Sequence, residues 1–377
     1  MTSILKTKLE DISRSRDKEL VLRAIELARK GIGLVSPNPL VGCVVVSAEG
    51  DVVGEGTYIY DGVAHAEIVA LEQAGERSRG GTAYVSLEPH THFGRTAPCT
   101  EALIEAGIQR VVAPIDDPNP LVSGRGFQRL REAGIEVTTG IHADAATQLN
   151  EKFIKWHQKK RPFVHLKLAM SLDGRISLGR SVSTAISGET ALTRVHELRH
   201  EHDAILVGGN TAFVDDPSLT DRSGLSRRRP LLRVVLDNRL RMNPDSKLAR
   251  TAKETPTMVF TAPGTDSNCL LDKGVEVVEL EHGGRDLNAV LRTLAERDIQ
   301  SILVEGGTEI AGAFCDAGLI DKVTFIVAPL IVGGSDAPNA VGGRGASSLS
   351  EAPRLGNITI ERLGEDIEIT GYPSTAS

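Results

Sequence analysis

The sequence has few aromatic residues and no excess of positive charge. Aromatic side chains make up 3% of the 377 residues, and the formal net charge is −7. A nucleic-acid-binding surface needs Lys and Arg to neutralise phosphates, and it often uses exposed rings to stack on bases. The composition therefore argues against a nucleic-acid partner.

The chain also lacks a long apolar run and a disulfide framework. No segment reaches the roughly 20 apolar residues of a membrane-spanning helix, and residues 1–17 mix acidic and basic side chains where a signal peptide would be apolar. The four cysteines, at positions 43, 99, 269 and 315, show no framework spacing. We expect a cytoplasmic protein with reduced thiols and no membrane partner.

The length and the pattern of segments indicate two α/β domains. A chain of 377 residues with 40% hydrophobic side chains is too long for one ordinary core. Short apolar segments alternate with helical patterns from end to end, which is typical of a sheet covered by helices. A basic stretch before Pro162 marks the boundary. We predict a flexible extension (1–16), a first domain (17–147), a linker helix (148–161) and a second domain (162–377).

One group of residues in the first half points to metal chemistry. His65 precedes Glu67 by two positions, and the pairs Pro89-His90 and Pro98-Cys99 follow downstream. A His-x-Glu segment followed by Pro-Cys is typical of zinc-dependent deaminases. In these enzymes His and Cys hold the zinc ion, while the Glu moves protons and is not a ligand. We predict that His65, His90 and Cys99 bind Zn²⁺ and that Glu67 is catalytic.

His90 is unusual because a cysteine is expected at the first Pro-Cys position. Two imidazoles and one thiolate leave a zinc centre with about one positive charge, whereas one imidazole and two thiolates leave it neutral. The extra charge lowers the pKa of a bound water, but the lost thiolate weakens metal retention. The sequence leaves two alternatives open: a zinc site built with His90, or a metal-poor deaminase-like domain beside an active second domain.

The first half resembles the deaminase half of the bifunctional pyrimidine deaminase/reductases of riboflavin biosynthesis. The similar stretches are PNPLVGCVVV, VAHAEIVALEQAG, AYVSLEPHTHFGRTAPCTEALIEAGIQRVV and DPNP. The family motif Pro-Cys-x-His-x-Gly-Arg-Thr-x-Pro-Cys is matched except at His90. The resemblance implies a cytidine-deaminase-like α/β/α domain that uses zinc.

The second half gives weaker signals when its residues are taken alone. It has no Gly-x-Gly-x-x-Gly after a first strand, so the usual dinucleotide-binding pattern is missing. Gly208-Gly209 and Gly306-Gly307 each follow an apolar strand. Such corners let phosphate approach backbone N–H groups, but tight turns need the same small residues. The pattern alone leaves both interpretations open.

Four stretches of this half resemble the reductase half of the same riboflavin family: RPFVHLKLAMSLDGRIS, VHELRHEHDAILVGGNTAFVDDPSLTDR, RVVLDNRLR and ILVEGGTEIAGAF. The resemblance implies a dihydrofolate-reductase-like α/β domain that uses NADPH. It implies NADPH contacts at Ala169, Thr211, Asp215, Gly307, Thr308, Glu309, Ile310, Ala311, Gly312 and Ala313. It implies substrate contacts at Ser183, Arg199, Leu219, Arg222 and Glu305, with the two arginines suited to a ribose phosphate.

The two resemblances occur in the family's order and cover nearly the whole chain. They imply a two-step enzyme that deaminates a phosphorylated pyrimidine and then reduces its ribosyl chain. They also imply a homo-oligomer joined through the reductase domain. Two alternatives stay open: a chain with only the reductase active, motivated by His90, and a deaminase acting on RNA or free nucleotides, which the acidic composition disfavours.

Overall fold

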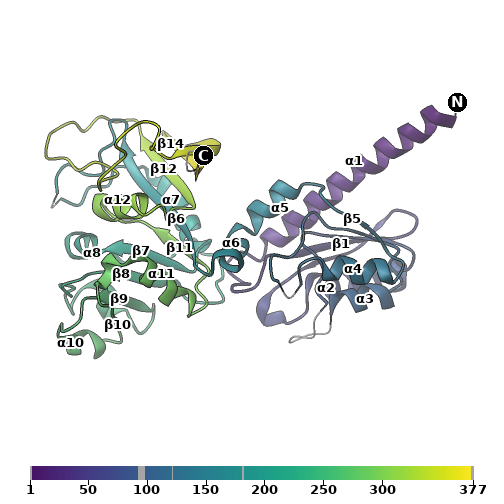
Figure 1. Ribbon diagram of the computed structural model, residues 1–377, viewed down its shortest axis with the longest axis horizontal. Helices are drawn as coiled ribbons and strands as arrows, with labels where there is room; N and C mark the ends of the chain where they lie inside the picture. The colour runs from purple at the N-terminus through teal and green to yellow at the C-terminus, as the bar shows by residue number, and fades with distance from the viewer. Residues whose placement is uncertain (1, 92–97, 121, 181, 375–377) are drawn as a thin grey trace. The chain divides into compact units, whose positions relative to one another are not determined.

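A computed structural model describes residues 2–91, 98–120, 122–180 and 182–374 of the chain (Figure 1). It divides into two compact units, Met1–Lys159 and Lys160–Ser377. The division falls inside the segment 148–161 that the sequence predicts as a linker. Residues 2–16 belong to the first helix, α1 (Thr2–Arg29), where the sequence predicts a flexible extension.

The first unit contains a five-stranded mixed sheet in the order β2-β1-β3-β4-β5. β1 pairs antiparallel with β2 and β3, whereas β3, β4 and β5 run parallel. The parallel strands bring the loops that follow them to one edge of the sheet. The strands are β1 (Gly42–Val46), β2 (Val52–Thr57), β3 (Thr82–Val85), β4 (Arg110–Val112) and β5 (Glu136–Thr138).

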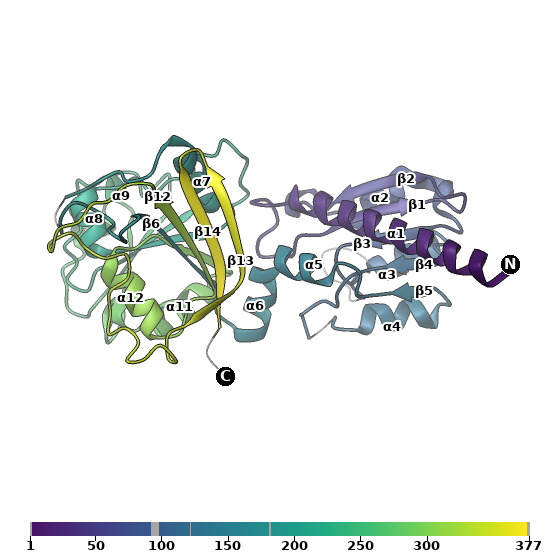
Figure 2. The same cartoon turned by 90° about the horizontal axis from the view of Figure 1, so that it is seen from above.

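Helices cover both faces of this sheet (Figures 1 and 2). Val44 and Val46 face α1 and α5 (Ala143–Leu149), and the alternate residues Cys43 and Val45 face α2 and α3. Gly56 lets α2 lie close to β2, because a Cβ there would be 2.0 Å from the Ala66 carbonyl oxygen. The second face carries α2 (Ala66–Ala74), α3 (Cys99–Glu105) and α4 (Arg125–Glu132), with the short helices η1 (Tyr60–Gly62) and η2 (Gly75–Ser78) in the connections.

The region of the predicted linker helix (148–161) contains the end of α5 and the whole of α6 (Glu151–Lys159), and the two helices meet at Asn150. The Asn150 side chain accepts from the Leu40 N–H at 2.9 Å and donates to the Leu40 carbonyl at 3.0 Å. These two bonds attach the junction between α5 and α6 to the loop before β1. The sequence periodicity does not reveal this junction.

The second unit contains a nine-stranded sheet in the order β10-β9-β8-β7-β11-β6-β12-β14-β13. The first seven strands of this order run parallel, and β14 is antiparallel to both of its neighbours. The strands are β6 (Phe163–Ser171), β7 (Ala204–Gly208), β8 (Leu232–Leu236), β9 (Thr257–Thr261), β10 (Glu276–Glu279), β11 (Ser301–Val304), β12 (Lys322–Ala328), β13 (Arg354–Leu363) and β14 (Asp366–Ser374).

Helices again cover both faces of the sheet. Because seven of its strands run parallel, their carboxyl ends meet at one open edge. Val234 and Leu236 of β8 pack in the core that includes α11 and α12, whereas Val235 packs toward α8, α9 and α10. The helices are α7 (Glu189–His200), α8 (Gly209–Asp215), α9 (Lys247–Arg250), α10 (Asn268–Leu271), α11 (Leu287–Ala295), α12 (Thr308–Asp316) and the short η3 (Gly283–Arg285). Open α/β sheets bind their ligands at such an edge.

Two general features agree with the composition. The four cysteines carry free thiols. Among the described residues, no helix combines the length and the apolar character needed to cross a membrane.

Candidate active sites

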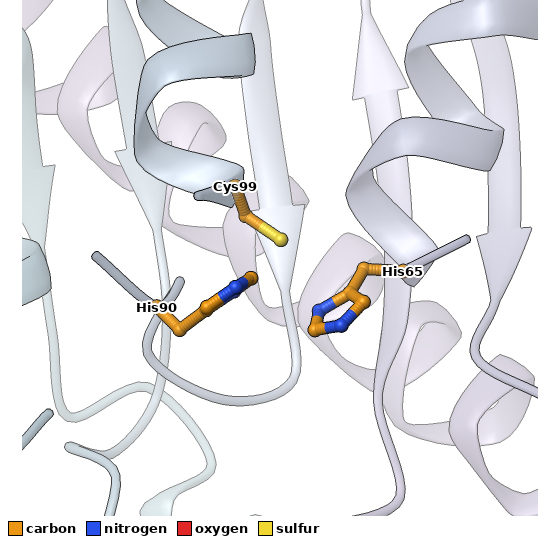
Figure 3. A group of neighbouring side chains, drawn as sticks. All are labelled: His65, His90 and Cys99. Atoms are coloured by element: carbon orange, nitrogen blue, oxygen red, sulfur yellow. The ribbon is translucent and has the colours of Figure 1, made fainter. Parts of the chain in front are cut away.

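The structure brings together the three residues that the sequence predicts as metal ligands (Figure 3). His65 is the N-cap of α2, Cys99 begins α3, and His90 lies in the loop after β3. One donor atom from each residue lies within 4.8 Å of the other two. The His90 loop is held there because the Thr100 N–H donates to the His90 carbonyl at 3.3 Å.

The donor set suits a zinc ion. Zinc binds imidazole and thiolate in tetrahedral geometry at about 2.0–2.3 Å, so small side-chain adjustments let all three donors reach one ion. Burial raises the pKa of the Cys99 thiol well above its usual value, and a cation beside it favours the thiolate. Three protein ligands leave a fourth position for water or substrate, as catalytic zinc sites require.

Glu67 is placed to carry protons at this site. It lies in the first turn of α2, two residues after His65, and is 2% exposed. Its Oε2 atom is buried and has no hydrogen-bond partner within the described part of the chain. Burial raises the pKa of Glu67, although nearby His65 opposes the rise. A buried carboxyl group with a free oxygen and a raised pKa is suited to accept and return a proton.

Glu88 braces the loop that carries His90. Its buried carboxylate accepts four backbone N–H groups, from Asp117 (3.0 Å), Gly124 (2.9 Å), Gly126 (2.8 Å) and Phe127 (3.2 Å). Glu88 therefore ties the 117–127 segment to the loop that carries His90. With both carboxylate oxygens engaged in these four bonds, Glu88 is suited to brace the loop rather than to act as a second acid.

We expect Glu88→Gln to destabilise the first unit by about 2–4 kcal/mol, because an amide NH₂ would replace an oxygen that accepts two N–H groups. Thermal unfolding and ammonia release measure the effect, and deamination should fall while reduction is unchanged. Glu105→Gln, on the exposed side of α3, is the matched control. A Glu88 variant as stable as this control would show that the bracing role is wrong.

The second candidate site is a cavity of about 880 Å³ at the carboxyl edge of the nine-stranded sheet. Most of the residues implied by the family resemblance line it: Ala169, Ser183, Arg199, Thr211, Asp215, Leu219, Glu305, Gly307, Thr308, Glu309 and Ile310. Arg222, Ala311, Gly312 and Ala313 do not line this cavity. Ala311 and Gly312 are buried within α12, and Arg222 is exposed in the loop after Leu219. The cavity is large enough for a dinucleotide's reactive end together with a substrate.

A cluster of three charged side chains forms one wall of the cavity. Arg199 donates to Glu305 through two nitrogens, at 2.7 and 3.0 Å, and the Lys167 ammonium lies 3.8 Å from the same carboxylate. The Glu305 side chain is 11% exposed. Burial alone would raise the pKa of Glu305, but Arg199 and Lys167 outweigh it and lower the value. Burial lowers the pKa of Lys167, which Glu305 partly offsets.

This cluster gives Arg199 partners within the protein. Its guanidinium donates to Glu305 and to the Thr220 carbonyl at 3.1 Å, and the contact with a ribose phosphate that the family resemblance implies stays a prediction. Lys167 was missed at the level of the sequence. Its only sequence signal is a lysine in the middle of an apolar strand, where an unpaired charge would be costly.

Arg227 belongs to a run of three arginines, 227–229, a charge pattern that favours a solvated loop, but the structure places its side chain against α7. Its side chain is 14% exposed and donates to the carbonyls of Arg199, His200 and His202 at the end of α7. It also contacts Asp221 at 3.2 Å. Arg227 thus holds the loop containing Arg222 against α7.

Part of the family motif lies outside the described residues. This applies to His92, a possible substitute metal ligand for which the family resemblance implies a loop or substrate role, and to Gly94, Arg95 and Thr96.

Comparison with known families matches both units. Residues 14–114 match the cytidine and deoxycytidylate deaminase zinc-binding region, and residues 162–369 match the RibD C-terminal domain. The riboflavin biosynthesis protein RibD of Bacillus amyloliquefaciens is 41% identical over 353 residues, covering 93% of this chain and 94% of that protein. The Escherichia coli RibD protein is 39% identical, with 93% and 98% covered.

Two similar solved structures extend the match to the whole fold. A deaminase/reductase from Thermotoga maritima has a TM-score of 0.85, and Acinetobacter baumannii RibD has a TM-score of 0.84. Each is 36% identical and covers 96% of this chain and 100% of its own. These findings confirm the predicted fold class, a cytidine-deaminase-like unit followed by a dihydrofolate-reductase-like unit. The chain belongs to the RibD family of bifunctional riboflavin biosynthesis enzymes, which combine a zinc-dependent deaminase with an NADPH-dependent reductase.

Proposed function

We propose that the first unit hydrolytically deaminates 2,5-diamino-6-ribosylamino-4(3H)-pyrimidinone 5′-phosphate. We propose that the second unit then reduces the ribosyl chain of 5-amino-6-(5-phosphoribosylamino)uracil to a ribityl chain. The observation that carries the first step is the convergence of His65, His90 and Cys99 beside buried Glu67. The similar Thermotoga maritima protein is a diaminohydroxyphosphoribosylaminopyrimidine deaminase and 5-amino-6-(5-phosphoribosylamino)uracil reductase, which supports the same pair of steps here.

In the deamination, His65, His90 and Cys99 hold the metal and Glu67 moves the protons. Zinc, when bound, supplies a Lewis acid that makes water a nucleophile at neutral pH. Glu67 accepts a proton from the water while the water oxygen bonds to the amine-bearing ring carbon. It then returns the proton to the departing nitrogen, the C–N bond breaks and ammonia leaves.

In the reduction, the second unit aligns the two reactants. NADPH, when bound, supplies a hydride for C1 of the ribosyl group. The bond from C1 to the ring oxygen breaks as the new C1–H bond forms, and that oxygen takes a proton from a water molecule. Arg199, Glu305 and Lys167 form a charged wall beside the reacting group, and their mutual contacts hold the three side chains in place.

The direct test uses the purified chain with the diamino substrate. We expect about one zinc per chain, stoichiometric release of ammonia, and NADPH oxidation that begins only as the deaminated product accumulates. Supplying that product directly should bypass the first step. Substoichiometric zinc with no ammonia release, beside normal reduction of the product, would favour the reductase-only alternative; a His90→Cys variant would then be expected to recover both.

We propose that two copies associate through the second unit at β13, the last strand of its sheet. Ile358 and Ile360 are 54% and 68% exposed on this strand. An exposed apolar edge strand is prone to pair with another chain. In a two-fold dimer, the β13 strands of the two copies would cover each other. Sedimentation velocity should show a dimer that Ile360→Lys converts to monomer. A monomeric native chain at micromolar concentration would contradict this proposal.

We further propose a cytoplasmic location, because the free state of the four cysteines suits a reducing compartment.

A further inference from the structure

Arg233 is a completely buried arginine in the middle of β8 in the second unit. Its side chain lies on the same face of the strand as Val235, which packs toward α8, α9 and α10. In the part of the chain that the structure describes, Arg233 forms no ion pair. Burial lowers the pKa of Arg233 to about 10, so the guanidinium stays charged at neutral pH. A buried charge without an acidic partner is costly, which indicates a task that an apolar side chain could not perform.

The guanidinium connects three separate segments of the second unit. Its Nη1 atom donates to the Ser218 carbonyl at 3.1 Å and to the Thr251 hydroxyl at 2.8 Å. Its Nη2 atom donates to the Leu248 carbonyl at 3.0 Å and to the Thr255 carbonyl at 2.6 Å. Among the described residues, the Ser218 carbonyl has no other donor. Arg233 therefore ties the loop after α8 to the end of α9 and to the segment before β9.

The loop that contains Ser218 has a strained backbone. Asp216 and Leu219 have φ angles of +38° and +48°. Residues other than glycine adopt such angles at a cost in free energy and keep them only where neighbouring groups hold the chain. Asp216 has its own anchor, because its carboxylate accepts from the Lys247 N–H at 2.8 Å. At the Leu219 end, the loop is held through the bond from Arg233 to the Ser218 carbonyl.

The Leu219 end of this loop adjoins the charged wall of the large cavity. Leu219 lines the cavity, and the carbonyl of the next residue, Thr220, accepts from Arg199 at 3.1 Å. Arg199 in turn donates to Glu305. A shift of the 218–220 backbone would therefore move both a cavity-lining side chain and a partner of the charged wall.

We propose that Arg233 is a positioning residue of the reductase, which holds the 218–220 backbone in the place that binding of the ribosyl substrate requires. This proposal rests on the proposed reductase function. Arg233 does not line the cavity, so it acts through Ser218 and Leu219 and not by contact with a reactant. A guanidinium suits this task because its planar fork directs four terminal N–H groups at once, whereas an ammonium has three donors.

The test is steady-state kinetics of the full chain with the deaminated product and NADPH. Arg233→Met keeps much of the side-chain volume and removes the donors. We expect the KM for the deaminated product to rise about 10-fold, with kcat lowered less than about threefold. The KM for NADPH should change less than about twofold, since the Asp216 end of the loop keeps its own anchor. The rate of deamination should be unchanged.

The matched control is Val235→Ala, which removes buried volume from the same face of β8 and leaves the four bonds of Arg233 in place. It should lower the unfolding temperature without raising the KM for the deaminated product. An equal rise of that KM in the control would overturn the proposal. A native KM in folded Arg233→Met would also overturn it, while native reduction would leave the proposed function intact.

A second variant decides the question if Arg233→Met does not fold. Arg233→Lys keeps the buried charge, but its three donors cannot serve four acceptors. A KM for the deaminated product raised about threefold would support the proposal, and a native KM would overturn it. A native chain that does not reduce the product would overturn the proposed reductase function together with this role of Arg233.

Discussion

Glu67→Gln should reduce deamination by about 10³-fold and leave reduction of the deaminated product unchanged. The amide cannot accept the proton from water, and general acid–base catalysis contributes roughly 10²- to 10⁴-fold. Zinc content should stay the same, because Glu67 is not among the clustered ligands. Ammonia release and NADPH oxidation, measured with the two substrates separately, give the two rates.

The control for this variant is Glu72→Gln, on the exposed side of the same helix. It carries the same chemical change away from the site and should behave like the native chain. Loss of both activities in the Glu67 variant, with the protein still folded, would contradict two separate sites. Full deamination by that variant would remove Glu67 from the chemistry.

Glu305→Gln should have the opposite pattern, with reduction lowered about 100-fold and deamination retained. The substitution leaves Arg199 and Lys167 without their shared carboxylate in a nearly buried wall. Breaking a buried ion pair from one side costs about 3–5 kcal/mol, so unfolding of the second unit should occur at lower temperature. Without Glu305 the pKa of Lys167 should fall further, because burial and Arg199 then act unopposed.

Reductase kinetics and thermal unfolding measure these effects, and Glu254→Gln at an exposed position is the control. A Glu305 variant with native stability and native reduction would show that the charged wall is dispensable. The two carboxylate variants together test the independence of the two sites, because each should affect one activity alone.

The residues closest together in sequence were the easiest to predict. His65 and Glu67 are two positions apart at the start of one helix, and Pro98 leads directly into Cys99 at the start of another. Local helix-start signals place these side chains, so the sequence alone indicates their chemistry. The long-range step, bringing His90 beside both, was inferred from the deaminase pattern and the family resemblance, not from periodicity.

The contacts that depend on distant segments could not be predicted. The four N–H groups on Glu88 come from residues about 30 to 40 positions away, and Arg199 meets Glu305 across 106 positions. Arg227 looked solvated because a run of charges says nothing about helix-end carbonyls elsewhere in the chain. Each case is a buried polar group whose partners are set by tertiary packing.

The central claim is that His90 replaces a thiolate ligand without destroying the zinc site. X-ray absorption at the zinc edge of the purified chain tests it most directly, because nitrogen and sulfur neighbours differ in distance by about 0.2–0.3 Å. We expect one sulfur, two imidazole nitrogens and one water oxygen around each zinc ion. In His90→Ala, one of the imidazole nitrogens should be lost. Two sulfur neighbours, or a first shell unchanged in His90→Ala, would contradict the account.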